Sequence, residues 1–155
     1  MVVDIDLGFR AITREINSLQ NVRIQVGFQE GEVTHTQTKG NRVQQPGLNM
    51  AQIAAQNEFG TATIPQRSFI RTAWDENINQ INQVVEQQVG LIVDQRQTPA
   101  QSFATIGNVL VALIQRKIYQ IRTPPNSPRT IALKGSSKPL IDFGQMVASV
   151  RYVVR

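Results

Sequence analysis

Residues that could take part in catalysis are few in this chain, and they are widely spaced. His35 is the only histidine, and it lies in a segment that contains Gly31 and Gly40. Acid–base and nucleophilic catalysis need a proton-transferring group and a nucleophile within hydrogen-bond reach of each other. The sequence contains no nucleophile motif, no glycine-rich phosphate loop and no cluster with metal-ligand spacing. We therefore expect a protein that is not an enzyme, with no catalytic residue, no cofactor and no metal site.

The charged residues that remain as candidates favour structural roles. Asp75 and Glu76 are the only adjacent acids. Neighbours on a helix point about 100° apart, so these two carboxylates cannot easily share a substrate. Glu58 and Arg67 flank a short turn, and we expect an ion pair between them that clamps this turn.

The segment 53–69, IAAQNEFGTATIPQRSF, is the most informative part of the sequence. Small and apolar residues recur at helical spacing up to Phe59, and Gly60 stands where a left-handed residue commonly ends a helix. The residues between Gly60 and Pro65 are expected to be extended, because proline disfavours helical backbone in the residue before it. The fixed φ of Pro65 suits the first turn of a second helix. That second helix is expected to include Arg67 and Phe69.

A second informative segment, PLIDFGQMVASV, covers residues 139–150. Asp142 can cap a short helix that extends to about Ala148. After it, Val150, Tyr152 and Val154 alternate with Arg151 and Val153, which is the period-two pattern of a half-buried strand. The segment therefore predicts a short helix followed by a closing strand.

In this order and at this spacing, the two segments resemble the small neck and tail-completion proteins of tailed bacteriophages, also labelled virion-morphogenesis proteins. In that family an alanine-rich helix ending in Glu-Phe-Gly is followed by Ile-Pro-x-Arg-x-Phe, and Pro-Leu-Ile-Asp-x-Gly-x-Met or Leu comes near the C-terminus. Two residues depart from this pattern: Ser68 stands where a second proline is common, and Phe143 where a threonine is common. The order and spacing agree over most of the chain, through Glu58, Phe59, Gly60, Ile64, Pro65, Arg67 and Phe69 in the first segment and Pro139, Leu140, Ile141, Asp142, Gly144, Met146 and Ser149 in the second.

The resemblance implies a structural virion protein: an α+β subunit, one domain over residues 1–155, that assembles into a ring expected to be a hexamer. Such a ring acts in head-tail joining as a neck, tail-completion or tail-terminator component. The implied partners are copies of itself, the portal or adaptor side, the tail tube, and DNA in the channel. The implied location is the virion, after assembly in the host cytoplasm. The residues expected at assembly contacts are Glu58, Phe59, Gly60, Ile64, Pro65, Arg67, Phe69, Leu140, Asp142, Gly144 and Met146.

Charge is distributed unevenly along the chain. Residues 1–95 hold seven Lys and Arg against ten Asp and Glu, a net charge of −3, whereas residues 96–155 hold nine against one, a net charge of +8. The basic half can bind the acidic half of a neighbouring subunit in a head-to-tail contact, and this is the interpretation that we favour. It can instead track phosphates, which would make the chain a basic DNA-binding accessory protein. The basic residues in question are Arg116, Lys117, Arg122, Arg129, Lys134 and Lys138.

Apolar periodicity predicts an α+β fold dominated by two long antiparallel helices. A helix over about residues 66–95 carries the apolar stripe Ile70, Trp74, Ile78, Ile81, Val85, Val89 and Ile92. A second stripe starts at Phe103, after a break at Thr98-Pro99. The two stripes are expected to pack together as the stable core. Glycines at 90 and 107 are expected to let the two backbones approach closely.

A small antiparallel sheet and shorter elements are expected around this helix pair. We expect a first helix over about residues 5–19, ended by Asn21, and a strand over residues 22–28 that pairs with the closing strand. A two-stranded sheet is marginal, so a third strand is expected from residues 61–64, from a loop or from a neighbouring subunit. Residues 29–49 contain three glycines, one proline and few apolar residues, and residues 122–139 contain four prolines, one glycine and three serines. Both segments are expected to be mobile docking loops.

The remaining composition excludes several protein classes. The chain has no cysteine, which rules out a disulfide framework and thiolate metal sites. Nowhere do 18 apolar residues occur together, so we expect no membrane-spanning segment, and MVVDIDLGF lacks the basic start of a signal peptide.

Overall fold

The structure of the chain is a computed structural model, and it describes residues 9–155 with the exception of 21, 30, 40 and 45. Its two long helices and small antiparallel sheet confirm the α+β fold class expected from the sequence. The elements follow in the order α1 (Phe9–Leu19), β1 (Ile24–Phe28), β2 (Gln37–Lys39), β3 (Arg42–Gln44), α2 (Met50–Phe59), α3 (Ile70–Val93), α4 (Pro99–Gln120), α5 (Pro128–Lys134), α6 (Gln145–Ala148) and β4 (Val150–Val154).

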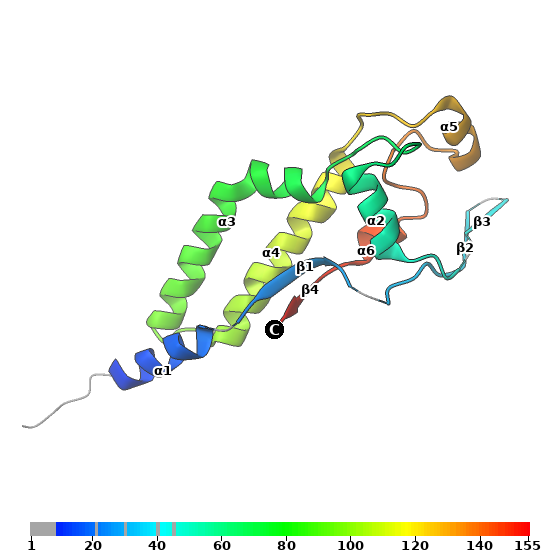
Figure 1. Cartoon of the computed structure of the whole chain (residues 1–155). Coiled ribbons are helices and arrows are strands. Elements are labelled where there is room, and N and C mark those ends of the chain that lie inside the picture. The colour runs from blue at the N-terminus through cyan, green and yellow to red at the C-terminus, as the bar shows by residue number, and fades with distance from the viewer. Residues whose placement is uncertain (1–8, 21, 30, 40, 45) are drawn as a thin grey trace, which may run out of the picture.

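Helices α3 and α4 form the long part of the molecule and lie side by side as an antiparallel pair (Figure 1). Helix α4 begins with a capping box: Thr98 Oγ1 accepts the N–H of Gln101 at 3.3 Å, and Gln101 Oε1 accepts the N–H of Thr98 at 3.0 Å. Pro99 takes the first helical position, where a missing N–H leaves no bond unmade. The structure thus confirms the predicted helix pair and its short turn.

Strands β1 and β4 pair in antiparallel register and pack against α4. The register runs from Ile24 opposite Val154 to Phe28 opposite Val150. Both the closing strand and its predicted partner are therefore confirmed. The strand expected from residue 22 begins two residues later, and the expected helix residues 5–8, like Asn21, lie outside the described part of the chain.

The third strand expected from residues 61–64 is not formed. The N–H of Thr61 donates to the carbonyl of Ile64 at 2.8 Å, and Thr61 Oγ1 accepts the N–H of Ile64 at 3.0 Å, so these residues close a turn. In the part of the chain that the structure describes, the β1–β4 sheet has two strands. Helix α4 supports it in place of a third strand.

Gly107 allows the close contact between α4 and the sheet. A Cβ at this position would lie 2.4 Å from Cδ2 of Tyr152, so the Tyr152 ring lies directly against the helix backbone. At Gly90 an added Cβ would meet nothing within 4 Å. The expectation that these glycines bring α3 and α4 together is therefore wrong, because the close approach at Gly107 is between a helix and a strand.

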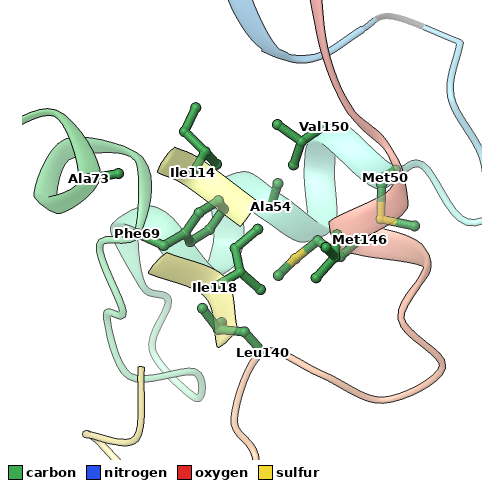
Figure 2. Packing of buried hydrophobic residues seen from close by; sticks show 10 residues of the cluster. Met50, Ala54, Phe69, Ala73, Ile114, Ile118, Leu140, Met146 and Val150 are labelled. Atoms are coloured by element: carbon green, nitrogen blue, oxygen red, sulfur yellow. The ribbon is translucent and has the colours of Figure 1, made fainter. Parts of the chain in front are cut away.

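The larger apolar cluster lies where α2, α4 and α6 meet the start of α3 (Figure 2). Phe69 is fully buried there, and its ring meets that of Phe28 edge-on with 6.0 Å between the centroids. Burial of one such side chain contributes about 1.5–3 kcal/mol. The buried members are Met50, Ala54, Phe69, Ala73, Ile114, Ile118, Leu140, Met146, Val147 and Val150, and a second cluster farther along the helix pair contains Ile81, Ile106, Leu110 and Leu113.

Both segments that were expected to be loops contain regular structure. Residues 29–49 hold the β2–β3 ribbon, and residues 122–139 hold helix α5. Ser127 Oγ accepts the N–H of Thr130 at 3.1 Å at the start of α5, and Gly135 ends it with a left-handed φ of 61°. Ser127 and Gly135, which indicated a loop, therefore cap a helix. The expectation that these two segments are irregular loops is thus corrected.

Candidate functional site

Glu58, next to the end of α2, caps the start of α3 with its carboxylate. Oε2 accepts the N–H groups of Phe69 and Ile70 at 2.7 and 2.8 Å, and Oε1 accepts that of Arg71 at 3.1 Å. These three groups would otherwise lack partners, because the first N–H groups of a helix have none within it. A negative charge at a helix N-terminus is also favoured by the helix dipole. Glu58 is only 4% exposed, so the cap is an internal joint between two helices.

Residues 65–69, just before α3, are not part of a helix, which corrects the expected helix start. Helix α3 begins at Ile70 with Phe69 as its N-cap, so Pro65 lies five residues before the helix, and Arg67 and Phe69 are outside it. The N–H of Arg67 donates to the carbonyl of Asn57 at 2.7 Å, which holds this segment against α2. Ser68, which replaces the proline common in the resembled family, donates its hydroxyl to Glu58 Oε1 at 2.6 Å.

Gly60 ends α2 as predicted, but in a different backbone conformation. Its φ is 77° and its ψ is 170°, a combination that is almost restricted to glycine and is not left-handed helical. A Cβ there would lie 3.0 Å from the backbone nitrogen of Gln66. The neighbouring Phe59 is 67% exposed, and Pro65 is exposed as well. The turn therefore presents apolar side chains to solvent on a tightly fixed backbone.

Arg67 does not form the expected ion pair with Glu58. Its Nε donates to the carbonyl of Pro124 at 2.7 Å, and its Nη2 donates to the carbonyl of Pro125 at 3.0 Å and to Asn126 Oδ1 at 3.3 Å. Arg67 is 6% exposed, and this burial lowers its pKa from the ordinary value. Arg67 therefore fastens the segment after α4 to the segment before α3.

Asp142 does not cap α6, which corrects its expected role. Its two carboxylate oxygens accept hydrogen bonds from Nη1 and Nη2 of Arg42, both at 2.8 Å. This contact raises the pKa of Arg42, and the Arg42 guanidinium also lies 5.0 Å from the ring centre of Phe143. The N-cap of α6 is Gly144, with a φ of 82°. Asp142 thus fixes the β2–β3 ribbon to the C-terminal motif.

The other members of the second motif, and the only histidine, have structural positions. Leu140 and Met146 are buried in the larger cluster (Figure 2). Gln145 Oε1 accepts the N–H of His35 at 2.8 Å, and Gln145 Nε2 donates to the carbonyl of His35 at 2.6 Å. No group of three or more potential metal ligands occurs in the described ranges.

The two motifs line one cleft, which we call the Arg67 cleft. It has a volume of about 640 Å³, and its walls come from the turn before α3, the α5 segment and the start of the second motif. The lining includes Arg67, Lys134 and Asp142 as charged residues, and Ile64, Pro65, Pro125, Pro128 and Pro139 as apolar residues. Sequence reasoning found Arg67 and Asp142 but missed Asn126 and the placement of Lys134, because the region was interpreted as an irregular loop.

The basic residues do not form one continuous stripe. Arg116 donates to Asn77 Oδ1 at 2.8 Å, and Lys117 pairs with Glu76, so both bind α3. Arg122 donates to backbone carbonyls next to it, at 2.5 Å for Tyr119. Lys134 donates to the carbonyls of Lys138 and Pro139 at 3.3 and 3.0 Å, while Arg129 and Lys138 are exposed.

Helix α3 exposes a row of apolar side chains, which we call the α3 apolar face. The sequence predicted its stripe to be buried, but only Ile81 and Ile92 of that stripe are buried, and Ile70 is half-buried. The stripe is wider than α4 can cover. The adjacent apolar residues Val84 and Val85 were the feature of the sequence that indicated this width. The exposed members and their exposed fractions are Trp74 48%, Ile78 37%, Val85 36%, Val89 46% and Val93 37%.

Comparison with known proteins adds no assignment to this geometry. No protein-family model, curated protein or solved structure matches this chain. Among the described residues, no helix is both long enough and apolar enough to cross a membrane.

Proposed function

We propose that this chain is a structural virion subunit that forms a ring in the neck of a tailed bacteriophage, as a tail-completion or tail-terminator protein in head-tail joining. The observation that carries the proposal is the α3 apolar face. Apolar surface aligned along a helix and left uncovered in one subunit commonly marks a protein contact. The resemblance of the two sequence motifs to the neck family supports the choice of this assembly.

The composition of α3 supports a contact with a second copy. Between its apolar residues the helix carries mainly asparagine and glutamine, and few charges. Burying an amide that finds a hydrogen bond costs much less than burying an ion. A neighbouring subunit can therefore cover this helix while burying few charges, and the head-to-tail repetition of one such contact closes a ring when its rotation allows.

The internal pairing of basic residues favours this role over a DNA-binding accessory protein. Arg116 and Lys117 bind α3, and Arg122 binds backbone carbonyls next to it, so these three side chains are already engaged within the subunit. Nonspecific DNA binding depends on cations that are free to replace the counterions of phosphates. Arg129 and Lys138 remain exposed for that purpose.

Self-association tests the proposal directly. Val89→Glu places a charge in the α3 apolar face, and Gln87→Glu places the same charge at an exposed position off that face. We expect the parent chain and Gln87→Glu to form a ring in sedimentation velocity at concentrations where Val89→Glu stays monomeric. Trp74, the only tryptophan, should shift its fluorescence to shorter wavelength on assembly.

A monomer at every concentration whose affinity for duplex DNA falls steeply with salt would contradict the proposal and favour the accessory role. Equal association of the two variants would exclude the α3 apolar face as the contact.

A further inference from the structure

We propose that the Arg67 cleft of one subunit binds the amino-terminal segment, residues 1–8, of the next subunit in the ring. This inference rests on the ring-forming role proposed above and names the contact partner of a second surface. The cleft contains a buried cation with unused hydrogen-bond donors.

Arg67 provides that cation at the wall of the cleft. It is 6% exposed, and its Nε and Nη2 are bound to three acceptors of the 124–126 segment. In the part of the chain that the structure describes, Nη1 makes no hydrogen bond, and Arg67 lines the cleft. The three acceptors of Arg67 are neutral, so its charge has no direct counter-charge among the described residues. A carboxylate entering the cleft would supply one, through a charge-assisted hydrogen bond.

The surroundings of the cleft have an excess of positive charge. Lys134 also lines it, and Arg67, Arg42 and Lys39 are close enough to lower the pKa of Lys134 electrostatically. Among the described residues Asp142 is the only acid on the lining, and both of its oxygens are bound to Arg42. The cleft is therefore a site for a negatively charged group. The lining also contains the apolar side chains of Ile64 and of four prolines.

The amino-terminal segment, MVVDIDLG, has both complementary features. Val3, Ile5 and Leu7 alternate with Asp4 and Asp6. Successive side chains of an extended chain point to opposite sides. An extended segment would therefore present its carboxylates to the cationic side of the cleft and its aliphatic side chains to the prolines.

The segment cannot reach the cleft of its own subunit. Ala11 and Glu15 of α1 border a pocket together with Thr98, at the start of α4. The cleft lies beyond the other end of α4, a helix of 22 residues, which corresponds to about 33 Å. An extended segment of eight residues spans at most about 28 Å. Figure 1 places α1 and α5 at opposite ends of the molecule. The contact is thus between subunits and head-to-tail.

Duplex DNA is the less suitable occupant. Backbone phosphates are bound by cations spread over an exposed surface, whereas Arg67 is buried in a cleft of about 640 Å³ whose walls include Pro65, Pro128 and Pro139. A peptide with alternating acidic and aliphatic residues would contact both the cationic and the apolar side chains of the cleft.

A synthetic peptide tests the contact without altering the fold of the protein. The probe is residues 1–8, acetylated and amidated so that Asp4 and Asp6 carry its only charges, with a fluorescent label for anisotropy. The full chain is used at a concentration where it is monomeric. We expect saturable binding, about tenfold weaker for the peptide with Asp4→Asn and Asp6→Asn, which corresponds to about 1.4 kcal/mol.

Protein variants locate the site. Lys134→Gln, in the cleft, should weaken binding by a similar factor, and Arg96→Gln, which removes one positive charge at the α3–α4 turn, should leave it unchanged. The proposal would be overturned if the peptide did not bind, or if the two peptides bound equally. It would also be overturned if duplex DNA displaced the peptide in a Lys134-dependent manner. A chain that still forms rings after Asp4→Asn and Asp6→Asn would refute this contact while leaving the ring-forming role intact.

Discussion

The carboxylate of Glu58 accepts the backbone N–H of Phe69 at 2.7 Å, and this bond joins two helices through residues 11 positions apart. Phe69 is itself a fully buried residue of the larger apolar cluster. The hydrogen bond from Glu58 and the apolar core therefore both fix the position of Phe69. Because Arg67 lies two residues earlier, the joint also sets the position of the cleft.

Replacement of Glu58 should destabilise the fold strongly. Glu58→Gln keeps the shape of the side chain but exchanges one accepting oxygen for a donor, which leaves buried N–H groups without partners. Hydrogen bonds to charged groups contribute about 1.5–3 kcal/mol each, so we expect a loss of about 3 kcal/mol in the free energy of unfolding. Urea denaturation followed by circular dichroism measures it. Glu86→Gln, an exposed acid of α3, is the matched control and should change stability little.

Two glycine-to-alanine substitutions should have opposite effects. Gly90→Ala in α3 meets open space, and it should stabilise the chain by about 0.5–1 kcal/mol through helix propensity. Gly107→Ala forces a methyl group against the Tyr152 ring, and it should destabilise by about 1–3 kcal/mol. Thermal or urea unfolding compares them. Two changes of the same sign would contradict the contact between α4 and β4.

The Arg42–Asp142 ion pair should hold the β2–β3 ribbon in place. Asp142→Asn leaves one accepting oxygen where Arg42 now uses two. We expect trypsin to cleave the native chain first within residues 29–49 and 122–139, and Asp142→Asn to accelerate cleavage after Lys39 severalfold. Glu76→Gln, which breaks the ion pair of Lys117 between α3 and α4, should leave that rate unchanged. Equal rates for all three proteins would show that the ion pair does not hold the ribbon.

Stability should depend on pH through Lys134. Burial is the main cause that lowers its pKa from 10.5, Asp142 opposes this effect, and Arg67, Arg42 and Lys39 add to it. Between the lowered value and 10.5 the unfolded chain binds more protons than the folded chain, so stability rises with pH in that window. We expect the stability of the parent chain relative to Lys134→Gln to rise as the pH approaches 10.5 from below. A difference that is constant with pH, in urea titrations, would contradict this assignment.

The sequence alone determined the elements whose signals are local. The break at Thr98-Pro99, the stop at Gly60 and the strand over residues 150–154 depend on neighbouring residues, and each was found where it was predicted. Helix α5 also has local signals, Ser127 and Gly135, but the prolines around them led to the prediction of a loop.

Tertiary structure alone decided which residues meet and which faces are covered. Glu58 binds the start of α3, Arg67 binds the 124–126 segment and Asp142 binds Arg42, and each of these contacts joins segments that the sequence treats separately. Apolar periodicity showed which residues of α3 share a face, but it carries no information on how much neighbouring surface is available. Helix α4 covers only part of that stripe, and the remainder is left exposed by the other elements of the described residues.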